Sequence, residues 1–471
     1  MTALRMNAIN ERIINYIPMK KILYASILLL FAASSCQNFL EKEPVNAVSD
    51  AHPIFDQKSA ETALNGVYRE LASAGYYGET YVTLGFFPSG DIKNLTTGGA
   101  ANLVNINYRA DDVNFNTAWK AIYSTINRAN NVIAKIPSVE DPTFTQTLKD
   151  QYIGEAKLIR ALAYFDLARA WGGVQLILEP TTSLVERADV QRSSLDETYQ
   201  QILKDLQEAE QVLPESVNRI RATRHTVWAL RARLHLYREE WALAEEYATK
   251  LINLSTDYYL LKPFNAWFAN NVTGTAESVF ELQYSALNQS AIRNQMQHPT
   301  NGGTYRYAPN DRFVQLLNNQ ELSGGRKTLI GSVTQSNTTI WFGNLYYRLP
   351  ATDPAYVIRI AELYLIRAEA RAHLQHIAEG TADLNTIRER AEVPLSTANT
   401  QEALLLAIEN ERRIEFAFEA HRWFDLSRTG RAKTVLESLD QNTHVEAYEL
   451  LFPIPIEQVQ LDENLTQNPG Y

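Results

Sequence analysis

The sequence is poor in cysteine. Cys36 is the only one among 471 residues, so no intrachain disulfide can form even in an oxidising compartment. The eight histidines are scattered along the chain, and together with one thiol they do not form the ligand spacing of a soft-metal site. The sequence also lacks a glycine-rich phosphate loop and a dinucleotide-binding fingerprint. We therefore predict no metal site and no cofactor.

Positive charge is also in deficit. The chain has 44 lysines and arginines against 54 aspartates and glutamates, which gives a formal net charge of −10. Nucleic acid needs a basic face to meet its phosphates, so the composition argues against a nucleic-acid partner. An acidic body is not drawn to anionic lipid either, and attachment to a membrane would need a separate anchor.

Catalytic signatures are absent as well. The sequence has no His-Glu-x-x-His metal motif and no Gly-x-Ser-x-Gly nucleophile elbow. Carboxylate pairs do occur, and Glu415 and Glu419 are spaced four residues apart in a segment that also holds Arg412, Arg413 and Arg422. This pattern favours salt bridges over the acid and nucleophile of a glycosidase. We predict that the chain is not an enzyme.

A lipid-attachment signal is present near the start of the chain. Two lysines at 20–21 precede an apolar segment at 22–31, and small residues at 33–35 precede Cys36. An apolar segment of this length cannot cross a hydrocarbon core, which requires about 20 residues in a helix. The arrangement is typical of a bacterial lipoprotein signal, so we expect residues 1–35 to be removed, Met19 to be the true start and Cys36 to be acylated. The alternative is a buried cysteine that ends an ordinary apolar helix.

The remainder of the chain predicts one helical body. Residues 36–46 form a short lipidated linker, and 47–471 contain helical stretches interrupted by loop-rich insertions at about 72–113 and 256–350. Helical periodicity is clear at 151–171 and 356–374, and a helix pair is predicted at 226–238 and 241–253. The stretch at 356–374 is apolar on two faces, which suits the interior of a stacked array of helices. Paired helices of this size favour tetratricopeptide-type units, although chance similarity of alanine-rich helices is the alternative.

Several segments resemble the SusD/RagB family of surface glycan-binding lipoproteins, which serve Gram-negative nutrient importers. The most specific of them spans 411–430, in which charged residues alternate with Phe416, Phe418, Trp423 and Phe424, and we interpret it as scaffold. The segments occur in the family's order over nearly the whole mature chain, at 36–44, 164–174, 359–370, 384–391, 411–430, 452–455 and 467–471.

The resemblance implies an all-α fold, a superhelix of tetratricopeptide-like helical pairs with large irregular loop insertions. It implies an outer-membrane location, with the lipid-anchored protein facing the exterior. It further implies an oligosaccharide ligand and a partner, a SusC-like TonB-dependent barrel that the protein caps as a lid. Members of the family bind their ligands without hydrolysing them, and some serve peptide uptake.

The two insertions supply the candidate ligand-binding residues. Sugar rings stack their C–H faces on aromatic planes while their hydroxyls need polar partners, and the insertions interleave both residue types. The candidates in the first insertion are Tyr76, Tyr77, Tyr81, Phe86, Phe87, Asp91 and Asn94. Those in the second are Tyr305, Arg306, Tyr307, Asn310, Trp341, Phe342 and Tyr346. For each aromatic residue the alternative role is packing within the loop core.

Three functions remain open from the sequence. The first is a glycan-binding lid of an importer, and the second is the peptide-binding lid of the same type of importer. The third is a glycoside hydrolase, since an all-helical body can also carry carboxylate pairs. Release of product from oligosaccharides would identify the third, and saturable binding of peptides in place of glycans would identify the second.

Overall fold

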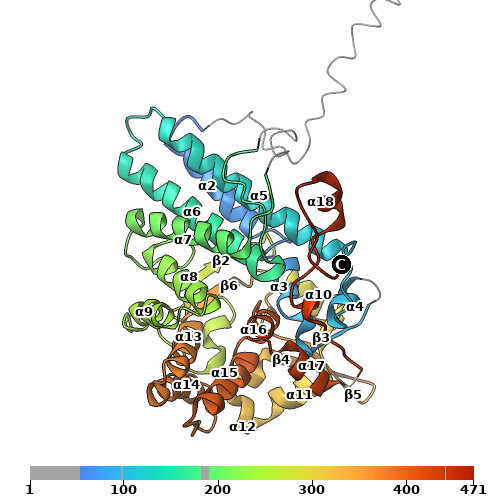
Figure 1. The fold of residues 1–471 in the computed structure, drawn as a ribbon. Helices are drawn as coiled ribbons and strands as arrows, with labels where there is room; N and C mark the ends of the chain where they lie inside the picture. The colour runs from blue at the N-terminus through green and yellow to red at the C-terminus, as the bar shows by residue number, and fades with distance from the viewer. Residues whose placement is uncertain (1–53, 97–98, 182–189, 441) are drawn as a thin grey trace, which may run out of the picture. The chain divides into compact units, whose positions relative to one another are not determined.

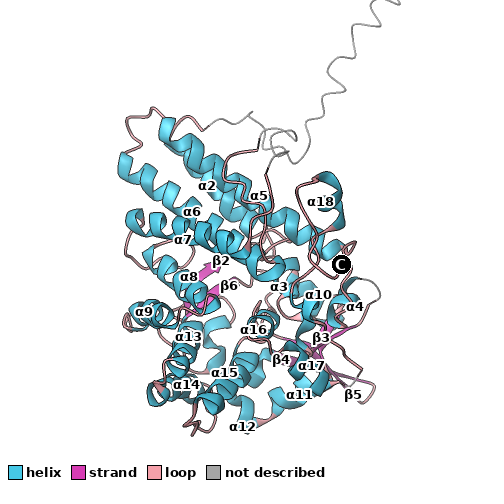
Figure 2. Cartoon of the chain, in the orientation of Figure 1, coloured by secondary structure: helices cyan, strands magenta, loops and turns pink. Residues whose placement is uncertain are grey.

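The structure is a computed structural model, and it describes residues 54–96, 99–181, 190–440 and 442–471. The predicted signal, Cys36 and the linker at 36–46 lie outside the described residues. Pro53–Tyr471 form one compact unit. Most of this unit is helical, and its strands are short (Figure 2). The predicted all-α class with tetratricopeptide-like helix pairs is confirmed.

Long helices pack in consecutive pairs along one side of the unit (Figure 1). The helices are α2 (Gln57–Leu71), α5 (Val113–Lys135), α6 (Gln146–Trp171), α7 (Leu195–Val212), α8 (Arg224–Tyr237), α9 (Trp241–Ile252), α13 (Ile360–His373), α14 (Ile377–Arg390) and α15 (Gln401–Glu415). In chain order α5 packs on α6, α6 on α7, α8 on α9 and α13 on α14, while α13 also contacts α9 and so joins the two halves of the array.

Helix α6 forms the centre of the first half of this array. The Thr145 hydroxyl accepts a hydrogen bond from the Leu148 amide and caps the helix start. From Tyr152 onward nearly every side chain is buried, because α5 and α7 cover the helix on different sides. The helix ends at Trp171, and the Gly172 that follows has a φ of 81°, a conformation that favours glycine. The sequence correctly predicted a helix here.

The helix predicted at 356–374 begins later than the sequence pattern indicated. Residues Ala355–Arg359 form strand β6, which pairs antiparallel with β2 (Ser278–Leu282), and only then does α13 begin at Ile360. Both strands are fully buried. A short run that is apolar on every side has no periodicity to separate a buried strand from a buried helix, and this explains the error.

The loop-rich stretches contain short elements. The first stretch holds α3 (Thr80–Leu84), η1 (Phe87–Ser89), β1 (Ile92–Asn94) and α4 (Gly99–Val104). The second holds η4 (Phe264–Phe268), β2, α10 (Ile292–Met296), η5 (Pro299–Asn301), β3 (Tyr307–Pro309), α11 (Asp311–Asn318), α12 (Gln320–Ser323), η6 (Gly324–Leu329), β4 (Ile330–Gln335) and β5 (Thr338–Gly343). The remaining short elements are η2 (Ile136–Ser138), α16 (Arg422–Arg428), α17 (Ala432–Leu439), η7 (Ala447–Leu450) and α18 (Ile456–Leu461).

A buried network of charges ties the second insertion to the C-terminal helices. Arg359, at the end of β6, donates to Glu277 at 2.9 Å, to Glu415 at 3.0 Å and to Glu419 at 2.6 Å. Arg390, at the end of α14, donates to both Glu277 oxygens at 2.6 and 2.8 Å and also pairs with Glu415. All five side chains are at most 3% exposed.

This network gives Glu415 and Glu419 the salt-bridge role that the sequence predicted. Their shared partner is Arg359, and Glu415 also pairs with Arg390; neither arginine belongs to the segment of the two glutamates. The aromatic residues of that segment, Phe416, Phe418, Trp423 and Phe424, are buried, as expected of scaffold. Within the described part of the chain, no helix combines the length and the apolar character needed to cross a membrane.

Candidate functional site

The two insertions meet in a small sheet. Strand β1 of the first insertion pairs antiparallel with β3 of the second, with Ile92 opposite Pro309 and Asn94 opposite Tyr307. The contact continues past the strand, because the Leu95 amide donates to the Arg306 carbonyl at 2.8 Å. The backbone thus holds polar segments that are about 200 residues apart in the chain at one place on the surface.

Three of the predicted residues lie at the surface beside this sheet, and we call Tyr305, Arg306 and Trp341 the rim. The Tyr305 hydroxyl donates to the Trp341 carbonyl at 2.8 Å, which joins the segment that leads into β3 to strand β5. Tyr305 and Trp341 are partly buried, and Arg306 is exposed. Tyr305 has a φ of 48°, an uncommon conformation for a residue with a side chain. The rim therefore offers two aromatic side chains and a guanidinium to solvent.

A polar hollow of about 380 Å³ lies on the same sheet, and we call it the insertion hollow. Among its lining residues, Lys93 pairs with Asp311 at 2.9 Å, whereas Arg312 forms no ion pair in the described part of the chain. The polar side chains that line the hollow are Lys93, Asn94, Thr96, Asn105, Asn310, Arg312, Asp440 and Thr443. Such a lining can donate and accept several hydrogen bonds at once.

Asn310 fixes one wall of the insertion hollow. Its Oδ1 accepts from the Phe313 amide at 3.0 Å and caps α11, while its Nδ2 donates to the Gly90 carbonyl at 2.7 Å. Its backbone amide donates to the Asp91 carbonyl at 2.8 Å. Because the Asn310 side chain already uses both ends of its amide, we assign it mainly to holding the wall.

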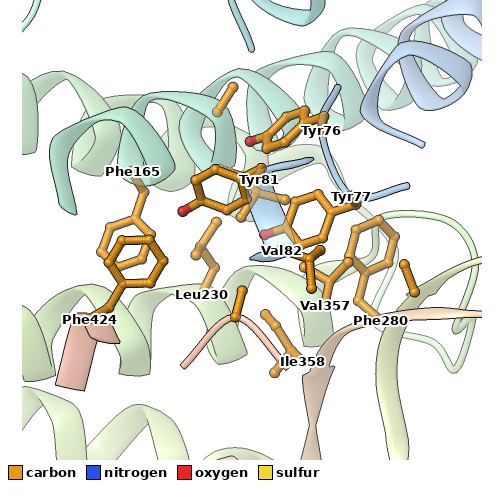
Figure 3. Packing of buried hydrophobic residues seen from close by; sticks show 14 of the residues in the cluster. Tyr76, Tyr77, Tyr81, Val82, Phe165, Leu230, Phe280, Val357, Ile358 and Phe424 are labelled. Carbon is orange, nitrogen blue, oxygen red and sulfur yellow. The ribbon is translucent and has the colours of Figure 1, made fainter. Parts of the chain in front are cut away.

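The three tyrosines of the first insertion lie in the core (Figure 3). Tyr76, Tyr77 and Tyr81 are at most 4% exposed. The hydroxyls of Tyr76 and Tyr77 donate to the Asp166 carboxylate at 2.7 and 2.9 Å, and the Tyr81 hydroxyl accepts from Arg169 at 2.7 Å. Their rings are covered and their hydroxyls have hydrogen-bond partners, so these tyrosines present no face to a ligand. Their role is packing within the core, and the prediction that they bind ligand is wrong.

The other buried candidates also pack inside the body. Phe86, Phe87, Tyr307, Phe342 and Tyr346 are 2–4% exposed, and the Tyr307 ring lies edge-on to the Phe87 ring with centroids 4.8 Å apart. Asp91 is buried too, where it accepts from the Arg413 guanidinium at 3.0 and 3.1 Å. The structure therefore keeps Tyr305, Arg306 and Trp341 as the candidates at the rim, with Asn94 and Asn310 at the insertion hollow.

Glu79 links the two insertions electrostatically. Burial raises its pKa to about 7, although the charge of Arg306 and a hydrogen bond from Gln295 act in the opposite direction. The ordinary glutamate pKa is 4.5, so the folded chain takes up this proton more readily than the unfolded chain. The contribution of Glu79 to stability is complete below about pH 4.5 and is lost as the pH rises through about 7.

The Glu79→Gln variant should therefore gain stability relative to the wild type above pH 7, and the gain should disappear near pH 4.5. The glutamine cannot ionise and so avoids the cost of a half-buried carboxylate at high pH. The measurement is the free energy of unfolding of both proteins from pH 4.5 to 8.5. Parallel curves would show that Glu79 does not titrate as described.

Six further polar residues line the insertion hollow and were not predicted from the sequence: Lys93, Thr96, Asn105, Arg312, Asp440 and Thr443. Lys93 and Thr96 flank the predicted Asn94, and Arg312 follows Asn310 by two residues. Proximity to those asparagines could have found these three residues, whereas Asn105, Asp440 and Thr443 give no such signal. Among the described residues, no group of three or more His, Cys, Asp or Glu side chains could hold a metal ion.

Comparison with known proteins identifies the family of the chain. A family model described as starch-binding and associating with the outer membrane matches residues 38–237, and the model of the SusD family matches 347–471. The SusD-like protein P38 of Formosa agariphila is 27% identical over 96% of this chain and 100% of its own length. The chain belongs to the SusD/RagB family. The Starch-binding protein SusD of Bacteroides thetaiotaomicron is 33% identical over 26% of this chain and 22% of its own length.

Solved structures of the SusD superfamily share the fold. One from Bacteroides vulgatus has a TM-score of 0.79 at 20% identity and covers 88% of this chain and 99% of its own. A laminarin-binding SusD-like protein has a TM-score of 0.74 at 23% identity, covering 88% of this chain and 100% of its own. At these identities the likeness shows that the SusD fold is common to all of them.

Proposed function

We propose that this SusD/RagB member is a surface-exposed lipoprotein that binds oligosaccharide at the rim and caps a SusC-like TonB-dependent transporter for import. The family supports this proposal, since one relative is a starch-binding protein and one structural neighbour binds laminarin. The description of the matching family model, which associates it with the outer membrane, supports the location.

The observation that carries the ligand assignment is the joining of the two insertions by β1 and β3. It brings the partly exposed rings of Tyr305 and Trp341 near a hollow lined by amides, hydroxyls, a carboxylate and cations. A sugar can rest a C–H face on the aromatic surface while its hydroxyls reach polar side chains. Because each hydrogen bond to sugar replaces one to water, we expect weak binding whose strength depends on the aromatic contact.

A hydrolase is not favoured by the geometry of the carboxylates. Glu415 and Glu419 form the pair singled out in the sequence, and both are buried against Arg359. A glycosidase needs its two carboxyl groups to flank a bound glycosidic bond. This pair is enclosed by the scaffold, and the structure favours binding over hydrolysis.

A titration that includes all three alternatives tests the proposed function. The purified body, residues 37–471, is titrated by calorimetry with a panel of oligosaccharides and a panel of peptides, and the glycan samples are afterwards analysed for shorter products. We expect saturable binding of at least one glycan with no product. Saturable binding of peptides alone would support the peptide-importing alternative, and shortened glycans would support the hydrolase.

The anchor gives a separate prediction. Replacing Cys36 by alanine removes the thiol that we expect to be acylated, so the protein should lose incorporation of labelled palmitate and leave the membrane fraction. Fractionation of cells that express wild type or Cys36→Ala measures this directly. A matched substitution at Ser35 by alanine retains the thiol and should stay in the membrane fraction. Membrane retention of Cys36→Ala would contradict the lipid anchor.

A further inference from the structure

A second hollow, which shares no lining residue with the insertion hollow, lies where the ends of several helices meet, and we call it the helix-end hollow. Its volume is about 570 Å³, within the range of small-molecule sites. Tyr237 at the end of α8 and Trp241 at the start of α9 form one side, and residues of α13, α15 and α16 complete it. Nothing in the proposed function uses this hollow.

An aromatic slab forms part of its wall. The Trp241 indole stacks on the His373 imidazole with ring centroids 3.8 Å apart and planes inclined by 5°. Both side chains are partly buried and line the hollow. Burial lowers the pKa of His373, which keeps the imidazole neutral at pH 7. The slab is thus a flat, uncharged surface of the kind on which apolar faces of ligands rest.

The cations of the hollow are already neutralised. Arg428 forms a bidentate ion pair with Glu369 at 2.6 and 2.8 Å and also contacts Asp425 at 3.0 Å. Arg431 pairs with Glu409 at 2.9 Å. Arg412 also pairs with Asp425, so every arginine that lines the hollow has a carboxylate partner within the described part of the chain, and the lining does not favour an acidic ligand.

One buried donor and two carboxylates of the lining nevertheless have no hydrogen-bond or ion-pair partner among the described residues. The Arg412 side chain is only 4% exposed, and its Nε donates to Asp425 at 2.8 Å, but its Nη1 makes no hydrogen bond in the described part of the chain. Glu402, on the first turn of α15, is exposed, and so is Glu239, which lies between α8 and α9. Neither carboxylate forms an ion pair or hydrogen bond among the described residues. A buried donor without a partner costs about 1–3 kcal/mol, and a ligand oxygen would relieve that cost.

We propose that the helix-end hollow is a second carbohydrate-binding site, which takes a neutral sugar ring against Trp241. A sugar hydroxyl both donates and accepts, so one ring can supply an acceptor to Arg412 and a donor to Glu402 while its C–H face meets the indole. This inference rests on the proposed function, because the ligand is a further part of the same kind of glycan. An organic cation attracted by Glu402 is the competing occupant.

Two leucines give a matched pair of variants for the test. Leu406 lines the hollow and is 50% exposed, so Leu406→Arg blocks it without disturbing the core. Leu395 is 58% exposed and does not line the hollow, so Leu395→Arg is the control. Each change is made in a Trp341→Ala background, which weakens the rim. The probes are the glycan panel, with laminarihexaose and maltohexaose included, and spermidine as the organic cation.

The Trp341→Ala protein should keep weak saturable binding of the glycan that the wild type binds. Adding Leu406→Arg should weaken that residual binding at least tenfold, and adding Leu395→Arg should leave it unchanged. If the wild type binds a glycan but Leu406→Arg has no effect, the second site is wrong and the proposed function stands. If only spermidine binding responds to Leu406→Arg, the hollow takes cations and the inference is overturned. If the wild type binds no glycan, the proposed function fails and the inference falls with it.

Discussion

Replacing Glu277 by glutamine is expected to lower the free energy of unfolding by about 3–5 kcal/mol. Glu277 is fully buried just before β2 and accepts from Arg390 at 2.6 and 2.8 Å and from Arg359 at 2.9 Å. The amide has nearly the same shape but no charge, so two guanidinium groups lose part of their compensation in a region closed to water. Breaking one side of a buried charge network is costly for this reason.

Denaturant unfolding followed by tryptophan fluorescence and circular dichroism measures this change. The control is Glu246→Ala, which removes a half-exposed carboxylate that pairs with Lys250 at 3.1 Å, and it should alter stability by less than about 1 kcal/mol. If Glu277→Gln and the control lose equal stability, the buried network does not hold β6, α14 and α15 together as described.

Replacing Trp341 by alanine is expected to weaken oligosaccharide binding at least tenfold, or about 1.4 kcal/mol. Sugar hydroxyls gain little on exchanging water for protein, so the aromatic contact supplies much of the affinity. Trp341 lies in β5 next to Tyr305, whose hydroxyl holds the Trp341 carbonyl. Trp341→Phe keeps an aromatic face and should retain more of the binding than alanine does.

The matched control for this variant is Trp228→Ala. Trp228 is likewise partly buried, but it lies in α8, where its indole donates to Glu210 at 2.8 Å, and it lines neither hollow. Calorimetric titration with the glycan that binds the wild type compares the variants, and circular dichroism confirms that each is folded. Equal affinity of Trp341→Ala and the wild type would show that the rim does not bind the glycan.

The long helices could be predicted because their signals are local. The predicted 151–171 lies within α6, and the pair predicted at 226–238 and 241–253 matches α8 and α9 to within two residues at each end. Apolar spacing and alanine content are properties of neighbouring residues, so one sequence suffices. Strand β6 was missed since its pairing partner, β2, lies more than 70 residues earlier in the chain.

The candidate site was only partly predictable because burial depends on distant partners. Tyr76 donates to Asp166, 90 residues away, and Asp91 pairs with Arg413, 322 residues away. No local pattern in the first insertion distinguishes these core residues from exposed ones. The pairing of β1 with β3 had no signal either, since strands of three residues show no periodicity.

Amide hydrogen exchange with and without saturating glycan tests the central claim most directly, because it reports where the ligand lies. Using a glycan from the panel that binds the wild type, the account predicts slower exchange in β5 and in the segment that runs from Tyr305 into β3. Glycan binding that leaves exchange at these residues unchanged would contradict the claim that the joined insertions form the ligand-binding surface.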